Sequence, residues 1–338
     1  MALLAASFPD VLWQLWHVFY TIVLPVLVLA GVGWLIQRKA GLDMGTLIRL
    51  NFHFVIPVMI YYSLVTSSLT WRAAGQVVAF SVAMVAAQSA LGWLIGWARR
   101  VPPDMRRVLI MTTMSYNSGN FGMPLQDMAF RQAGLGDAAM LYQAFVMITQ
   151  NLSNFTWGIF VISGHRKDRA LRDNLLHIVT FPPIWAMAAG LATVQIRNWI
   201  GPDAAATVAA RLDPFWQVAL YIKGAFIAVA LCTLGAQLAL VSRDRRQYPV
   251  GLSVVLRLLV GPAIGLGLIY AFGLTGFLAQ VMLISTASPT AVNCMLLALQ
   301  FDNHPDYAAR AVFYSTLLSP ITVTLVICLA QGGLLPGF

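Results

Sequence analysis

The chain has 338 residues, of which 59% are hydrophobic and only 10% are charged. Soluble domains carry about a quarter charged residues, so this composition excludes an ordinary soluble fold and predicts a surface that faces lipid. The formal net charge is +9, but the basic residues fall in short loops between apolar segments and form no basic face, which excludes nucleic acid as a partner. The sequence predicts an all-α integral membrane protein in a lipid bilayer.

Apolar runs bounded by charges, glycine or proline predict ten transmembrane helices in one domain that spans residues 1–338. The N-terminal MALLAASFPD lacks the basic start of a cleavable signal, so the first helix is expected to stay in the mature protein. The expected helices cover residues 15–36, 46–67, 75–97, 106–130, 139–163, 176–196, 217–240, 250–271, 278–300 and 310–331.

Most of the 21 lysines and arginines lie in alternate loops. The positive-inside rule places those loops in the cytoplasm and both termini outside. The excess of arginine over lysine hints at a bacterial source, and hence at a multi-pass protein of the inner membrane. The basic loops hold Arg38, Lys39 and Arg49; Arg99, Arg100, Arg106 and Arg107; Arg166, Lys167, Arg169 and Arg172; Arg243, Arg245 and Arg246; and Arg310.

A basic loop at about 164–175 divides the ten helices into a 5+5 pair of repeats, about 15–163 and 176–331. Because each half has an odd number of helices, the second is inverted relative to the first. PVLVLAGVGWLIQ, from Pro25, resembles PIWAMAAGLATVQ, from Pro183. The fourth and ninth helices are both interrupted, which predicts a binding site at mid-membrane.

The fourth helix contains SYNSGNFGMPL, a break that must face protein or water because unpaired backbone groups are costly in lipid. Gly119 and Gly122 are expected to adopt conformations that other residues avoid, and Pro124 to stand in the first turn of a restarting helix. Asn117 and Asn120 would add uncharged hydrogen bonds.

The ninth helix contains STASPTAVN, where Ser288 is expected to cap a second half-helix that begins at Pro289, with Thr290 and Asn293 beside it. Each helix start carries roughly +0.5 charge, so two such starts would hold a carboxylate. The alternative is that Pro124 and Pro289 are ordinary kinks, which are common in membrane helices.

Four ionisable residues fall within the predicted spans. Lys223 and Arg257 are expected to snorkel, or alternatively to attract an anion. Asp127 is expected to lie in the first turn of the restarted half-helix, where its carboxylate stabilises the positive end of the helix dipole. His53 is expected to form a hydrogen bond at a helix interface. Either residue could instead carry a coupling proton. Asn51 is interpreted as a polar residue at a helix end, and Pro57 as a bend in the second helix.

The segment NSGNFGMPL resembles the crossover motif of the auxin efflux carrier family, which includes bacterial malonate and other organic-acid permeases. From Ser288, SPTAVNCMLLALQFDNHPDYAARAVFYSTLLSPITVTLVI resembles the last two helices of that family. The resemblance implies crossing fourth and ninth helices, a scaffold-and-transporter organisation like that of bile-acid symporters, and substrate at the crossing. The resemblance also implies that the crossover residues of the family correspond here to Asn117, Gly122, Pro124 and Pro289.

The loop GHRKDRALRDN is short, unlike that of the plant members, so a small malonate-like carboxylate is expected in preference to auxin. A channel or membrane sensor is the alternative function. An intramembrane enzyme is disfavoured, because the sequence has no glutamate, H-E-x-x-H or G-x-S-x-G. No cofactor or metal is expected; coupling to protons or sodium ions and a homodimer remain open.

Overall fold

The computed structural model describes residues 8–66, 70–163, 179–241, 248–332 and 335, without the side chains of residues 8, 202, 203, 205 and 206. In this part of the chain the regular elements are helices, and two non-helical residues form one isolated β-bridge. Seven helical segments are long and apolar enough to span a membrane, which confirms a multi-pass, all-helical protein. The basic loop at 164–175, the start of the sixth expected helix, Arg243, Arg245 and Arg246 lie outside the described residues.

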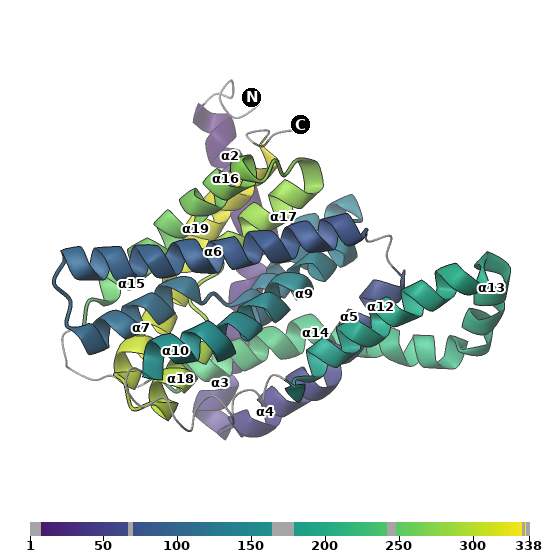
Figure 1. Cartoon of the computed structure of the whole chain (residues 1–338), viewed down its shortest axis with the longest axis horizontal. Helices are drawn as coiled ribbons and strands as arrows, with labels where there is room; N and C mark the ends of the chain where they lie inside the picture. Colours follow the sequence, from purple (N-terminus) through teal and green to yellow (C-terminus); the bar gives the residue numbers. More distant parts are fainter. Residues whose placement is uncertain (1–7, 67–69, 164–178, 242–247, 333–334, 336–338) are drawn as a thin grey trace.

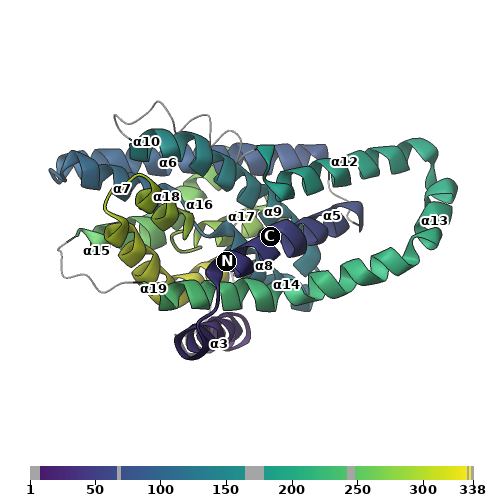
Figure 2. The same ribbon diagram turned by 90° about the horizontal axis from the view of Figure 1, so that it is seen from below.

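One group of helices comes from the start of the chain and from its middle (Figures 1 and 2). Within it, α3 packs on α14, α5 packs on both α12 and α14, and α13, which was not expected, joins α12 to α14. Gly201, with φ of +83°, separates α12 from α13. The group comprises α3 (Leu24–Ala40), α4 (Met44–Leu50), η2 (Asn51–Val55), α5 (Ile56–Thr66), α12 (Pro182–Ile200), α13 (Pro202–Arg211) and α14 (Asp213–Ala239). The segments before α3, α2 (Phe8–Val18) and η1 (Phe19–Val23), instead contact the last helix, α19 (Pro305–Gln331).

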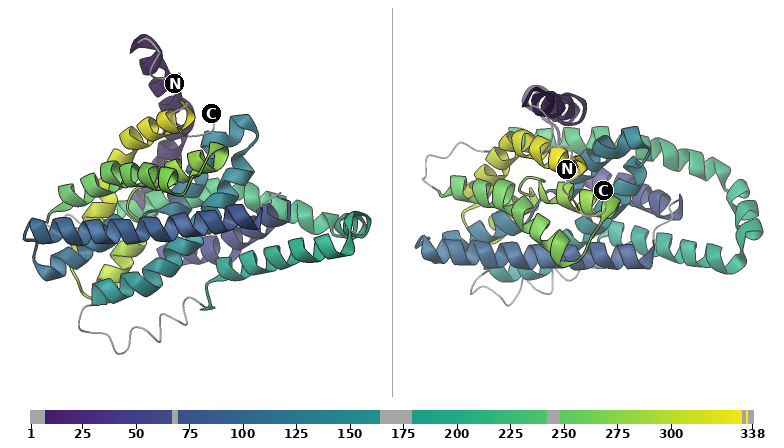
Figure 3. Two further views of the ribbon diagram at one scale, coloured as in Figure 1. Left: turned by 45° about the horizontal axis from the view of Figure 1, so that its top comes forward. Right: turned by 90° about the horizontal axis from the view of Figure 1, so that it is seen from above.

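The other group encloses the two broken helices, with the long α6 along one side (Figure 3). Here α6 packs on α7 and α9, α8 on α9, and α17 on α9 and α19. The group comprises α6 (Trp71–Ala98), α7 (Pro103–Met114), η3 (Ser118–Gly122), α8 (Met123–Phe130), η4 (Arg131–Ala133), α9 (Gly136–Ser153), η5 (Asn154–Gly158), α10 (Ile159–Ser163), α15 (Val250–Val255), η6 (Leu256–Val260), α16 (Gly261–Ala271), α17 (Gly276–Thr286), α18 (Asn293–Gln300) and α19 (Pro305–Gln331).

The described residues contain five wide π-turns, η1, η2, η3, η5 and η6. Four of them end two residues before a proline: Pro25, Pro57, Pro124 and Pro262. A proline ring clashes with the carbonyl four residues earlier and cannot donate a hydrogen bond, and a wider turn relieves that clash. Proline therefore determines where most of these helices widen, including the second helix, where a bend at Pro57 was expected.

Two glycines bring α3 and α14 close together. A Cβ atom on Gly235 would overlap the carbonyl oxygen of Ala30, and one on Gly33 would overlap the backbone of Cys232. Small residues allow such approach in membranes, where helix association depends on van der Waals packing rather than on water exclusion. Gly224, on the same helix α14, has open space around its Cα.

We expect Gly235→Ala to destabilise the protein by about 1–3 kcal/mol, the usual cost of overpacking a tight contact. Gly224→Ala, which adds the same methyl group to the same helix, should be neutral or slightly stabilising. Thermal unfolding of the two purified variants checks this. Equal unfolding temperatures would contradict the close α3–α14 packing.

Candidate functional site

The two broken helices meet and pair with each other at their breaks. The break between α7 and η3 and the break between α17 and α18 form an antiparallel β-bridge, Tyr116 with Thr290. The Asn117 N–H donates to the Pro289 carbonyl at 2.8 Å, and the Ala291 N–H donates to the Ser115 carbonyl at 3.0 Å. Each break thus supplies hydrogen bonds that the other lacks, as backbone away from water requires.

Side chains hold this bridge in place from neighbouring helices. The Thr290 N–H donates to Ser315 Oγ of α19 at 3.1 Å, and Thr290 Oγ1 donates to the Thr112 carbonyl of α7 at 3.0 Å. Ser115 Oγ donates to Asn154 Oδ1 in η5. Thr290 therefore ties the second break to the end of the first half-helix, a structural role that the sequence did not indicate.

The first break restarts earlier than the sequence predicted. The helix resumes as η3 at Ser118, so Pro124 stands one turn beyond the restart, at the beginning of α8. The prediction that Gly119 and Gly122 adopt backbone conformations that other residues avoid was wrong, since neither has a positive φ. Both glycines instead allow close packing: a Cβ on Gly122 would overlap the Gln143 side chain, and one on Gly119 would lie 3.2 Å from Met147 Sδ.

The second break restarts later than predicted. Helix α18 begins at Asn293, and Pro289 lies in the non-helical segment before it. Ser288 is not the helix cap: it is fully buried, its N–H donates to the Ser285 carbonyl and its Oγ has no partner among the described residues. Once the Pro289 carbonyl pairs with Asn117, this residue belongs to the bridge and cannot also begin the helix.

A cavity of about 50 Å³ lies where the two restarting helices meet. Asn120 at the start of one helix and Asn293 at the start of the other both line it. The described residues that line it include no charged side chain and seven amides. The amides are Asn117, Asn120, Gln150, Asn151, Asn154, Gln237 and Asn293; Ile48, Phe52, Tyr116, Ser118, Gly119, Met147, Ala291, Val292 and Leu296 complete the lining.

The cavity amides are partly bonded to one another. Asn293 Nδ2 donates to Asn151 Oδ1 at 2.8 Å. Asn117, Gln150 and Gln237 each retain a buried side-chain polar atom with no partner in the described part of the chain. Buried polar atoms without partners are unusual, and three that line one cavity suit a polar ligand.

Sequence reasoning missed much of this amide cluster. Asn51, interpreted as a helix-end residue, is fully buried and donates through Nδ2 to Asn120 Oδ1 at 2.9 Å. Asn151, Gln150 and Gln237 were not singled out. A usable signal was present, because uncharged amides are costly within apolar spans unless they are bonded to protein or ligand.

Arg257 is fully buried in η6 and does not snorkel. Its guanidinium donates to the Thr113 carbonyl at 3.1 Å, and also to the Thr286 carbonyl and to Gln88 Oε1. Thr113 and Thr286 lie in the last turns of α7 and α17, the half-helices that precede the two breaks.

This position explains how the fixed charge of Arg257 is tolerated although no described carboxylate pairs with it. Each helix end carries roughly −0.5 charge on its unpaired carbonyls, so one guanidinium balances two of them. The Arg257 Cζ atom also lies 4.8 Å from the centre of the Tyr116 ring, and Tyr116 lines the amide cavity. The Tyr116 ring thus separates Arg257 from the cavity, and the arginine is hydrogen-bonded to the ends of both α7 and α17.

The remaining predicted charges lie outside the cavity. Lys223 Nζ pairs with Asp137 Oδ2 at 2.6 Å, and the Lys223 side chain is 13% exposed. Asp127 lies near the end of α8 rather than in the first turn after the break, and pairs with Arg131. His53 is exposed and forms no hydrogen bond with a described residue, so the expected helix-interface bond is wrong.

We expect Arg257→Met to lose at least about 2–3 kcal/mol of stability, because it leaves buried carbonyls without a donor. Arg257→Lys should recover part of that loss, since an ammonium lacks the planar fork that reaches separate acceptors. Thermal unfolding of both variants checks this, with Arg72→Met, at an exposed position of α6, as the control. An Arg257→Met protein as stable as the control variant would contradict the clamp.

Comparison with known proteins identifies the family of the chain. A family model described as membrane transport protein matches residues 18–327. An uncharacterized transporter of Methanothermobacter thermautotrophicus is 27% identical over 313 residues, which cover 90% of this chain and 95% of that protein. Auxin efflux carrier component 1 of Arabidopsis thaliana is 32% identical over 114 residues, which cover 32% of this chain and 18% of the carrier. This chain belongs to the membrane transport protein family of the auxin efflux carrier type.

Proposed function

We propose that this protein is a secondary transporter for a small organic anion, which it binds between the paired breaks of its fourth and ninth helices. In this proposal ten helices form a 5+5 inverted repeat with both termini outside the cytoplasm. The observation that carries the proposal is the amide-lined cavity at two helix starts, beside the Tyr116–Thr290 bridge. Broken helices whose starts meet near mid-membrane are typical of secondary transporters.

The chemistry of the cavity favours a carboxylate over a cation. Helix starts present N–H groups and partial positive charge, and Arg257, behind the Tyr116 ring, balances the partial negative charge of the α7 and α17 ends. Among the described residues, no carboxylate side chain lines the cavity to compete with an anion. The Asn117 Nδ2 amide, which has no partner among the described residues, offers a further donor without fixing the substrate by a buried ion pair. A short malonate-like acid fits these features.

Alternating access accounts for the size of the cavity. About 50 Å³ holds little more than water, whereas sites for small molecules usually measure about 300–1,000 Å³. The two groups of helices must therefore separate for substrate to enter. Lys223 of α14 and Asp137 of α9 form an ion pair between these groups, one of the contacts that such a movement would change.

Counterflow in liposomes tests the proposal. Purified protein is assayed against malonate, malate, succinate and indole-3-acetate, with and without a proton or sodium gradient. We expect saturable exchange of a small carboxylate, and a loss of at least about tenfold in Asn117→Ala, which removes an amide from the cavity, and in Pro289→Ala, which alters the bridge. Asn198→Ala, at an exposed position of α12, is the control.

Wild-type exchange by both site variants would reject the proposed site. A carboxylate panel that is inert with the wild-type protein would reject the substrate class and favour the channel or sensor alternative.

A further inference from the structure

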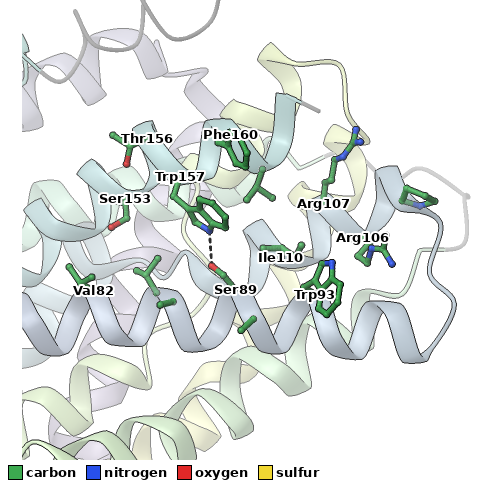
Figure 4. A pocket seen from close by; sticks show the side chains of 15 residues that line it. Val82, Ser89, Trp93, Arg106, Arg107, Ile110, Ser153, Thr156, Trp157 and Phe160 are labelled. Atoms are coloured by element: carbon green, nitrogen blue, oxygen red, sulfur yellow. Dashed lines mark hydrogen bonds between the residues drawn. The ribbon is translucent and has the colours of Figure 1, made fainter. Parts of the chain in front are cut away.

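A second, larger cavity lies on the outer side of the broken-helix group, away from the amide cavity. It is a groove of about 760 Å³ between α6, α7 and the η5–α10 segment (Figure 4). Its walls are mainly apolar, and Trp93, Trp157 and Phe160 line it while remaining about half exposed. Its volume lies within the range of about 300–1,000 Å³ usual for bound small molecules.

The polar side chains of the groove wall are occupied within the protein. Trp157 Nε1 donates to Ser89 Oγ at 3.1 Å, as Figure 4 shows. Ser153 and Thr156 donate their hydroxyl protons to carbonyls of the preceding helical turn. The wall therefore favours an apolar ligand over a polar one.

Positive charge is confined to one end of the groove, where Arg106 and Arg107 lie (Figure 4). The stem of Arg106 packs against α6 at Gly96, where an added Cβ would lie 2.7 Å from its Cγ. Arg106 has no ion-pair partner within the described ranges. Arg107 pairs with Asp104 at 3.0 Å, but Asp104 is 68% exposed, and such surface pairs are weak enough to be exchanged for another anion.

The length of the groove matches one leaflet of a bilayer. Its α6 wall runs from Val82 to Trp93, a rise of about 16 Å for a helix, and half of a hydrocarbon core is about 15 Å. An extended acyl chain that starts at the arginines would therefore reach from the membrane interface to the bilayer centre.

We propose that this groove is a binding site for an anionic phospholipid, with one acyl chain along α6 and α10 and the phosphate at Arg106 and Arg107. Arginine is well suited to phosphate because its fork donates two parallel hydrogen bonds. Basic pockets between membrane helices at the arginine-rich face bind anionic headgroups in this way. The site is independent of the proposed substrate site, since the two cavities share no lining residue.

Native mass spectrometry of the purified protein with phosphatidylglycerol and phosphatidylcholine of identical acyl chains tests this. We expect a preference for phosphatidylglycerol on the order of tenfold. The double variant Arg106→Gln/Arg107→Gln should lose the preference. Arg99→Gln/Arg100→Gln, which removes two exposed arginines at the end of α6 that do not line the groove, should keep it.

Filling the groove provides a second test that does not depend on charge. Ala90→Trp, at an exposed groove position, should reduce binding of both lipids several-fold, whereas Val78→Trp, on α6 outside the groove, should not. Equal binding of the two lipids by the wild type, or unchanged binding by Ala90→Trp, would overturn the proposal. So would a wild-type dimer that Ala90→Trp dissociates, because a second copy would then occupy the groove.

Discussion

The structure depends on how backbone groups are satisfied where two membrane helices stop. Away from water, each unpaired N–H or carbonyl costs free energy, so a single broken helix within an apolar span would be expensive. Here the break after α7 and the break after α17 bond to each other through the Tyr116–Thr290 bridge. Neither break is stable by this route without the other, which makes the pair one structural unit.

Of the four half-helix ends around this bridge, the two negative ends lie at Arg257 and the two positive ends lie at the amide cavity. The ends of α7 and α17 direct carbonyls at Arg257, whose buried guanidinium neutralises their partial negative charge. The starts of η3 and α18 instead adjoin the amide cavity. Arg257 thus balances the negative ends of α7 and α17, while the positive starts of η3 and α18 remain beside the cavity. This distribution of charge is the electrostatic basis for proposing an anion.

Sequence patterns were sufficient for the all-helical membrane architecture and for the two breaks, because long apolar runs are typical of membrane spans and Gly/Pro clusters within them interrupt a helix. They were insufficient for the way each break is built. Ser288 looked like a cap, yet its neighbour Pro289 is held in the bridge by Asn117, a contact between residues remote in sequence. Arg257 looked like a snorkelling side chain because its partners, the carbonyls of Thr113 and Thr286, carry no sequence signature.

The amide cluster shows the same limit at the level of single side chains. Asn51 and Asn120 lie on different helices, and only the fold brings their amides within 2.9 Å. Both belong to π-turns that precede a proline, η2 before Pro57 and η3 before Pro124. Wide turns of this kind often mark functional positions, so a proline that follows a buried asparagine in a membrane span is a pattern worth seeking in sequences.

In the proposed mechanism the transported anion occupies the cavity between the helix starts. Leu296 lines this cavity and is 44% exposed, whereas Leu299, on the same helix, is 63% exposed and does not line it. In a protein whose native cysteines are replaced, the rate at which a maleimide alkylates Leu296→Cys should fall when the transported anion is added, and the rate for Leu299→Cys should not change. Equal rates for Leu296→Cys with and without a saturating transported anion would contradict the account.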